Sequence, residues 1–111
     1  MHYTILGRTG LKVSVAGLGC GGASRLGMGR GGTRKAAADM VRAAMDLGIN
    51  LIDNARLYGT EEAVGDALKG VARDSVVLTT KHLSHSGERP HTPDEMVAGL
   101  HESLRALGTD Y

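Results

Sequence analysis

Aromatic residues are scarce in this chain of 111 residues, which has three tyrosines and no phenylalanine or tryptophan. A hydrophobic core must therefore be built from leucine, valine, isoleucine, alanine and methionine. The single cysteine, Cys20, excludes an internal disulfide bond and is typical of a reducing compartment. No apolar run approaches the length of a membrane span, and the first residues lack the core of a signal peptide. We therefore expect a cytoplasmic protein that does not enter a membrane.

The chain also has no large excess of positive or negative charge, since 13 basic and 12 acidic residues leave a net charge of +1. A nucleic-acid-binding surface requires basic residues clustered on one face, whereas here they are scattered along the chain. We therefore expect no nucleic-acid partner. One basic run, containing Arg25, Arg30, Arg34 and Lys35, is interpreted as a solvated face, with phosphate contact as the less favoured alternative.

Glycine, in contrast, is abundant: the chain has 17 glycines, about twice the average share of roughly 7%. Seven of them lie between Gly19 and Gly32, so the excess marks one long loop. A loop longer than the typical connection favours a functional or mobile segment.

The start of this loop, Gly17 to Gly22, matches the G-x-G-x-x-G pattern of dinucleotide-binding folds. That pattern requires a helix to begin at once, and an acid at a strand end about twenty residues later. Here helical periodicity begins only at Thr33, and Asp39 lies inside a helical pattern. We therefore reject a Rossmann fold.

Apolar periodicity and glycine-marked turns predict the elements in chain order. They are a hairpin with strands at 3–6 and 11–15, a buried strand at 15–19, a helix from 33 to 48, a strand at 50–52, a helix at 60–69, a strand at 76–80, a polar loop at 82–91 and a helix from 92 to 108. The predicted buried stripes are Ala37, Met40, Val41, Ala44 and Leu47 in the first helix and Met96, Val97, Leu100, Leu104 and Leu107 in the last. After the hairpin the order is βαβαβα, which favours a parallel sheet.

Three reactive side chains follow the carboxyl ends of these strands. Asp53 comes directly after one strand, Tyr58 follows five residues later, and Lys81 ends the next strand. Taken singly, each has an ordinary structural interpretation: Asp53 as an acid where a strand turns into a loop, Tyr58 as a residue that covers the end of the sheet, and Lys81 as a solvated lysine. Their joint placement favours a proton-transfer site, because barrel enzymes place their chemistry at strand carboxyl ends.

A metal site is the alternative for His82, His85 and His91, which lie in one polar stretch. They lack the regular ligand spacing of a helical or knuckle site, and no second cysteine assists them. We therefore interpret the stretch as a solvated loop and expect no metal.

The motif Asp53-Asn54-Ala55-Arg56-Leu57-Tyr58-Gly59, followed by Thr80-Lys81 at the next strand end, resembles the aldo-keto reductase family. The opening stretch from Leu6 to Ser14 and the run Gly17-Leu18-Gly19 resemble it too, so the likeness spans the whole chain. Two positions depart from the family pattern: Asn54 stands where threonine is common, and Glu61 where serine is frequent.

The resemblance implies the N-terminal part of a (β/α)₈ TIM barrel, in which residues 1–111 form one partial domain. Residues 1–15 would be a leading hairpin that plugs the barrel bottom, and residues 16–111 the first three βα units. Such barrels typically need about 250 residues, so we expect the barrel to be incomplete and the chain truncated. The fourth strand, which supplies a catalytic histidine in the family, would lie beyond Tyr111.

The resemblance also implies an NAD(P)H-dependent oxidoreductase that transfers hydride between a nicotinamide and a small aldehyde or ketone, or the corresponding alcohol. The cofactor would be NADP, or else NAD. Tyr58 would be the general acid, Lys81 would stabilise its phenolate, and Asp53 would hold Lys81 charged. The cofactor-binding residues would be Gly19, Cys20, Gly21 and Asp53, although the glycines also fit a purely structural role in tight packing.

Two non-catalytic alternatives stay open. The chain can be a half-barrel that serves as an interaction module, or an auxiliary subunit that keeps the fold without catalysis. For the truncated reductase as for these alternatives, we expect the 111 residues alone to be inactive, and we expect them to self-associate through open sheet edges.

Overall fold

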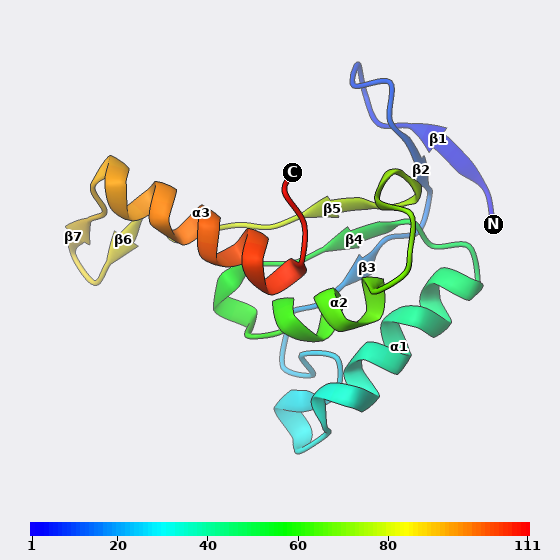
Figure 1. Cartoon of the computed structure of the whole chain (residues 1–111), viewed down its shortest axis with the longest axis horizontal. Coiled ribbons are helices and arrows are strands. Elements are labelled where there is room, and N and C mark those ends of the chain that lie inside the picture. Colours follow the sequence, from blue (N-terminus) through cyan, green and yellow to red (C-terminus); the bar gives the residue numbers. More distant parts are fainter.

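The computed structural model describes residues 1–111 and contains seven short strands, three α-helices and three 3₁₀ turns (Figure 1). In chain order these are β1 (Tyr3–Ile5), β2 (Lys12–Ser14), β3 (Leu18–Gly19), η1 (Met28–Arg30), α1 (Arg34–Asp46), β4 (Leu51–Asp53), η2 (Arg56–Tyr58), α2 (Glu61–Leu68), η3 (Arg73–Ser75), β5 (Val77–Thr79), β6 (His85–Ser86), β7 (Arg89–Pro90) and α3 (Pro93–Leu107).

The centre of the fold is a parallel sheet in the order β3-β4-β5, as the alternating pattern predicts. Its register aligns two adjacent rows of residues: Leu18, Ile52 and Leu78 in one, and Gly19, Asp53 and Thr79 in the other. Because successive side chains of a strand point to opposite faces, these rows lie on opposite faces of the sheet.

The helices cover only the face that carries Leu18, Ile52 and Leu78. Ile52 is fully buried there, and Leu18 and Leu78 pack against the core partly exposed. The remaining buried core residues come mainly from α1, α2 and the loop after β3: Cys20, Leu26, Ala37, Ala38, Val41, Ala63, Val64, Ala67 and Leu107. Only 20 of the 111 residues are buried, because no element packs on the opposite face of the sheet.

Helix ends follow their sequence signals closely. The hydroxyl of Thr33 accepts a hydrogen bond from the Ala36 N–H, which caps α1. Thr92 and Glu95 form a complete capping box at the start of α3, with Pro93 in its first turn. Gly48, after α1, and Gly108, after α3, have φ values of 90° and 67°, a conformation that glycine adopts at low cost.

The predicted buried stripes are wrong in part. In α1 the buried residues are Ala37, Ala38 and Val41, whereas Met40 is 47% and Leu47 73% exposed. The face of α1 that packs against the core is therefore rotated from the predicted stripe toward the alanines.

In α3 the buried residues are Gly99, Ser103 and Leu107, while Val97 and Leu100 are half exposed. Two close approaches involve this face: a Cβ on Gly65 of α2 would lie 2.3 Å from the Ala106 carbonyl oxygen, and a Cβ on Gly99 would lie 2.7 Å from the His82 ring. The covered face of α3 is thus packed against both α2 and His82.

Three further expectations are corrected in detail. The strand predicted at 15–19 is reduced to Leu18–Gly19, and residues 15–17 are exposed instead of buried. The helix predicted at 60–69 spans Glu61–Leu68. The polar loop at 82–91 contains the small antiparallel pair β6 and β7.

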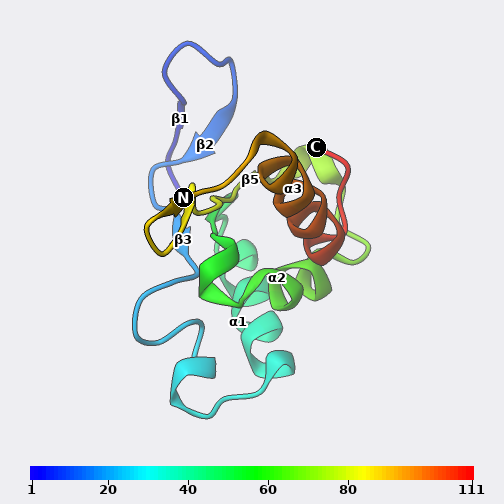
Figure 2. The ribbon, with the colours of Figure 1, turned by 90° about the vertical axis from the view of Figure 1, so that its left-hand side faces the viewer.

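The hairpin of β1 and β2 lies at the amino end of the parallel sheet. Asn50, just before β4, fastens it: its Oδ1 accepts from the Ser14 N–H at 2.7 Å, and its Nδ2 donates to the Lys12 carbonyl at 2.9 Å. Figure 2 shows the hairpin beyond one end of the sheet and the glycine-rich segment with η1 beyond the other. None of the helices has the length and apolar character needed to cross a membrane.

Candidate active site

Asp53 and Lys81 meet at the carboxyl edge of the sheet. Asp53 is the last residue of β4, and Lys81 follows the neighbouring strand β5 by two residues. The Lys81 Nζ lies 2.6 Å from Oδ1 of Asp53. The hydroxyl of Thr79 donates to the same oxygen at 2.6 Å. Two of the three predicted catalytic side chains are thus in direct contact.

This contact controls the charge of both groups. Hydrogen bonds from Lys81 and then from Thr79 hold the pKa of Asp53 below its usual range. The hydrogen bond to Asp53 in turn raises the pKa of Lys81. The side chains are 47% and 51% exposed, so solvent screens the pair and it adds little to fold stability. Its effect is to keep the ammonium charged and in place.

Tyr58, the third predicted residue, lies beside them on the η2 turn. Its ring centroid is 5.5 Å from the Lys81 Nζ. The turn is tied to the end of β5, because the Arg56 N–H donates to the Lys81 carbonyl at 3.1 Å. Gly59, with φ of 67°, ends the turn. Acid, phenol and amine therefore share one edge of the sheet, as the strand ends predict.

A buried polar layer connects the strand ends with α2. The Thr60 hydroxyl donates to Oδ1 of Asn54 at 2.8 Å, and both residues are almost fully buried. The Thr80 hydroxyl donates to the carboxylate of Glu61 at 2.7 Å, and Glu61 is only 6% exposed. The two positions that depart from the family pattern thus both anchor the segment between Asp53 and α2.

Sequence reasoning missed Thr79 as a partner in the site. A signal was present, because Asp53 and Thr79 both lie at the ends of predicted neighbouring strands, at the edge where Lys81 follows. In-register pairing with Asp53 then brings Thr79 to the carboxylate. The Asn54–Thr60 contact had no comparable signal, since it depends on the path of an irregular turn.

The predicted cofactor-binding residues lie at the end of β3, next to Asp53. The Cys20 N–H donates to the Asp53 carbonyl at 2.9 Å. The Cys20 side chain is fully buried, and burial, aided by the Asp53 charge, raises the pKa of its thiol to about 11. The backbones of Gly19 and Gly21 remain partly accessible, and a Cβ added at Gly19 would meet no atom within 4 Å. A flat ring therefore has room to approach this strand end.

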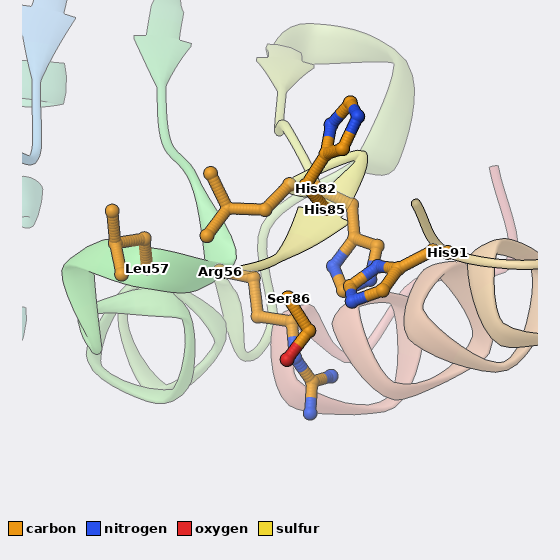
Figure 3. A pocket seen from close by; sticks show the side chains of 7 residues that line it. Arg56, Leu57, His82, His85, Ser86 and His91 are labelled. Atoms are coloured by element: carbon orange, nitrogen blue, oxygen red, sulfur yellow. The ribbon is translucent and has the colours of Figure 1, made fainter. Parts of the chain in front are cut away.

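The three histidines gather around an open hollow beside the site (Figure 3). Its volume is about 380 Å³, and its walls are Arg56, Leu57, His82, Leu83, His85, Ser86 and His91. The rings of His82 and His91 stack with centroids 5.2 Å apart. No group of three histidine, cysteine or acidic side chains is arranged to hold a metal ion. Asp53, Tyr58 and Lys81 do not line this hollow, although its walls come from the residues that flank Tyr58 and Lys81.

Known proteins match the whole chain. It is 38% identical to the aldo-keto reductase YhdN of Bacillus subtilis, with all of this chain and 36% of that protein aligned. It is 35% identical to a probable voltage-gated potassium channel subunit beta of rice, with all of this chain and 35% of that protein aligned. The structure matches the holo form of an aldo-keto reductase from Bacillus halodurans with a TM-score of 0.80 and 32% identity, covering 100% of this chain and 38% of that one. A Bombyx mori aldo-keto reductase in complex with NADP matches with a TM-score of 0.77 and 28% identity, covering 99% and 35%.

The chain thus spans about a third of the length of the curated relatives it matches. Its hairpin and open parallel sheet correspond to the N-terminal part of the barrel in these relatives. The family model of the aldo/keto reductases matches residues 18–111, which include β3, β4, β5 and the edge that carries Asp53, Tyr58 and Lys81. The chain therefore belongs to the aldo/keto reductase family.

Proposed function

We propose that this chain is the N-terminal part of an NAD(P)H-dependent oxidoreductase that interconverts a small aldehyde or ketone with its alcohol. The observation that carries the proposal is the 2.6 Å contact between Lys81 and Asp53, with the Tyr58 ring 5.5 Å from the same ammonium. An acid, an amine and a phenol at the carboxyl edge of barrel strands suit proton transfer.

The proposed role of Tyr58 is to donate its hydroxyl proton to the carbonyl oxygen of the substrate. The positive charge of Lys81 stabilises the phenolate that remains, because a nearby opposite charge favours the ionised form of the phenol. Asp53 keeps Lys81 protonated and directs its Nζ. In the reverse direction the same phenolate takes the proton from the alcohol.

A nicotinamide, when bound, supplies or accepts the hydride. The residues proposed to hold it are Gly19, Cys20, Gly21 and Asp53; the Cys20 side chain is fully buried, so the accessible contacts come from the two glycine backbones and Asp53. Support comes from the open space at Gly19 and from relatives: the Bombyx mori enzyme is in complex with NADP, and a 39% identical protein of Schizosaccharomyces pombe is named an NAD/NADP-dependent indole-3-acetaldehyde reductase. We propose NADP, with NAD as the alternative.

The proposal is tested with a completed barrel, in which residues 1–111 are followed by the remaining C-terminal part of the Bacillus subtilis relative. We expect carbonyl-dependent oxidation of NADPH by the completed barrel and negligible turnover by the 111 residues alone. In the completed barrel, Tyr58→Phe should lower kcat by about 10²- to 10⁴-fold, the usual contribution of a positioned general acid.

The matched control is Tyr3→Phe, because Tyr3 lies in the hairpin at the opposite end of the sheet. Its expected turnover is unchanged. Full turnover by the Tyr58→Phe variant would remove Tyr58 from the proposed role. Robust turnover by the 111 residues alone would show that the rest of the barrel is dispensable.

A second candidate function is that of an auxiliary subunit. The rice relative named as a channel subunit, aligned along the entire chain, favours it. This candidate predicts a completed barrel without turnover toward a panel of aldehydes and ketones, while binding to a protein partner persists. Turnover by the completed barrel would favour the reductase instead.

A further inference from the structure

Gly21 lacks the usual reason for being glycine. Ten glycines of the chain have a positive φ, a conformation that other residues adopt only at a cost, but Gly21 is not among them. Its backbone could therefore carry any side chain. Whether a side chain fits at this position is therefore decided by its surroundings.

Those surroundings are the ring of Tyr58. A Cβ built on Gly21 would lie 2.7 Å from Cε2 and from Cζ of Tyr58, and 2.9 Å from Cε1. Ordinary van der Waals contacts of a Cβ begin at about 3.4 Å. The outer half of the phenol ring, the part that carries the hydroxyl, thus rests directly on the backbone after β3.

We propose that Gly21 is a positioning residue for Tyr58: its missing side chain leaves the space in which the phenol ring lies beside Lys81. This inference rests on the proposed function for the role of Tyr58, and it adds a role for Gly21 distinct from cofactor contact. It also links three strand ends, because Gly21 follows β3, Tyr58 follows β4 and Lys81 follows β5.

The consequence of filling this space is local. In a Gly21→Ala variant the new methyl group and the ring must separate by about 0.7 Å, the difference between 2.7 and 3.4 Å. The clashing atoms belong to the outer end of the Tyr58 side chain, which can rotate aside at lower cost than backbone. We therefore expect the fold to persist and the phenol to move. A misplacement of about 1 Å can cost on the order of 10²-fold in rate.

The control is Gly17→Ala, a glycine just before β3 with no positive φ. The three atoms nearest to a Cβ there all belong to Leu51, at ordinary contact distances of 3.4 Å or more. Both variants add one methyl group to the same segment of chain, so they differ mainly in whether that group meets the ring.

The experiment is a double-mutant cycle in the completed barrel, combined with crystal structures of the single variants. Gly21→Ala should lower kcat by about 10- to 100-fold, with an unfolding midpoint close to that of the parent, and the crystal structure should show the Tyr58 ring displaced from its position beside Lys81. In the Tyr58→Phe background, where no proton donor remains to be positioned, Gly21→Ala should cost less than about twofold. Gly17→Ala should retain kcat in both backgrounds.

Three outcomes would overturn the inference: an undisplaced ring in the Gly21→Ala crystal structure, an equal loss of kcat in both backgrounds, or a loss confined to NADPH affinity. The last two would mean that Gly21 acts on the cofactor or the fold instead of on Tyr58. Failure of the proposed function gives a different result, namely that Tyr58→Phe itself leaves kcat unchanged while Gly21→Ala still displaces the ring.

Discussion

Lys81 and Asp53 share a 2.6 Å contact across two neighbouring parallel strands, although they are 28 residues apart in the chain. The contact exists because β4 and β5 pair in register, so their carboxyl ends fall at one edge. Asp53 is also held by the Thr79 hydroxyl, which leaves its carboxylate little freedom to turn away. The pair is thus oriented by the sheet itself, and Lys81 is fixed by a partner that belongs to the rigid part of the fold.

Asp53→Asn should lower the pKa of Lys81 back toward its ordinary value of 10.5, because the charged hydrogen-bond acceptor is lost. In the parent, the attraction between the two charged groups is lost as pH falls through the depressed pKa of Asp53, because the carboxylate is then protonated. It is lost again as pH rises through the raised pKa of Lys81, because the ammonium is then deprotonated. It is intact between about 3.8 and 10.5. NMR titration of ¹³C-labelled lysine side chains measures this. The control is Asp39→Asn, which removes the partner of Lys35 and should leave the Lys81 titration unchanged.

Asn54→Ala should destabilise the fold, because two buried donors lose their acceptor. Oδ1 of Asn54 accepts from the Thr60 hydroxyl and from the Ala55 N–H, both at 2.8 Å. Leaving a buried donor unpaired costs about 1–3 kcal/mol, so for two donors we expect a decrease in the free energy of unfolding of about 2–6 kcal/mol. Denaturant titration of the completed barrel measures it.

The control for Asn54→Ala is Leu57→Ala on the same turn. Leu57 is 63% exposed, and substitutions at exposed positions usually change stability by less than about 0.5 kcal/mol. An equal loss in both variants would mean that the turn is sensitive to any change, and that the polar contacts of Asn54 have no special weight.

The α3 capping box should make the start of that helix sensitive to acid. Hydrogen bonds from Arg89, and then from the Thr92 N–H, lower the pKa of Glu95 from 4.5 to about 2. Since the unfolded carboxyl binds its proton at higher pH, the contribution of Glu95 is complete above about 4.5 and is lost as pH falls toward 2. Glu95→Gln should remove this dependence. NMR titration of the Glu95 carboxyl, with amide exchange at Met96, provides the measurement. A titration near 4.5 in the parent would contradict the prediction.

The elements and the reactive edge could be predicted from the sequence because they depend on local signals. Thr33 and Thr92 begin helices because their hydroxyls accept hydrogen bonds from free backbone N–H groups. Pro93 favours a first turn because it has no N–H that would need a partner. Gly48 and Gly108 end the helices. Parallel neighbours then bring residues that follow strands to one edge, which placed Asp53 and Lys81 together. These inferences need only chain order and the period of two along a strand.

The buried helix faces could not be predicted in the same way. Periodicity singles out the apolar residues of a helix, but the partner decides which side of that stripe is covered. In α3 the close approaches are those of Ala106 to Gly65 and of Gly99 to the His82 ring, and Leu100 is left half exposed. The contact of Gly21 with the Tyr58 ring is equally non-local, since it depends on the path of two separate loops after β3 and β4.

The open sheet should make the isolated 111 residues associate with one another. β3 and β5 are edge strands, and unpaired edges present N–H and C=O groups that pair with other chains. The face opposite the helices carries the row of Leu51 and Val77, and no element covers it. Two exposed leucines, Leu47 just after α1 and Leu100 in α3, add further apolar surface.

We therefore expect a concentration-dependent sedimentation coefficient and a broad thermal transition for the isolated chain, whereas the completed barrel should be free of both. Val77→Lys places a charge on the open face of an edge strand, a common means of blocking strand pairing, and should reduce the association. Ser75→Lys, in the exposed turn just before β5, adds the same charge away from that face and should not. A monodisperse monomer that melts cooperatively above about 60 °C, within the upper part of the mesophile range, would show that the uncovered face and edges of this sheet are stable in water without partners.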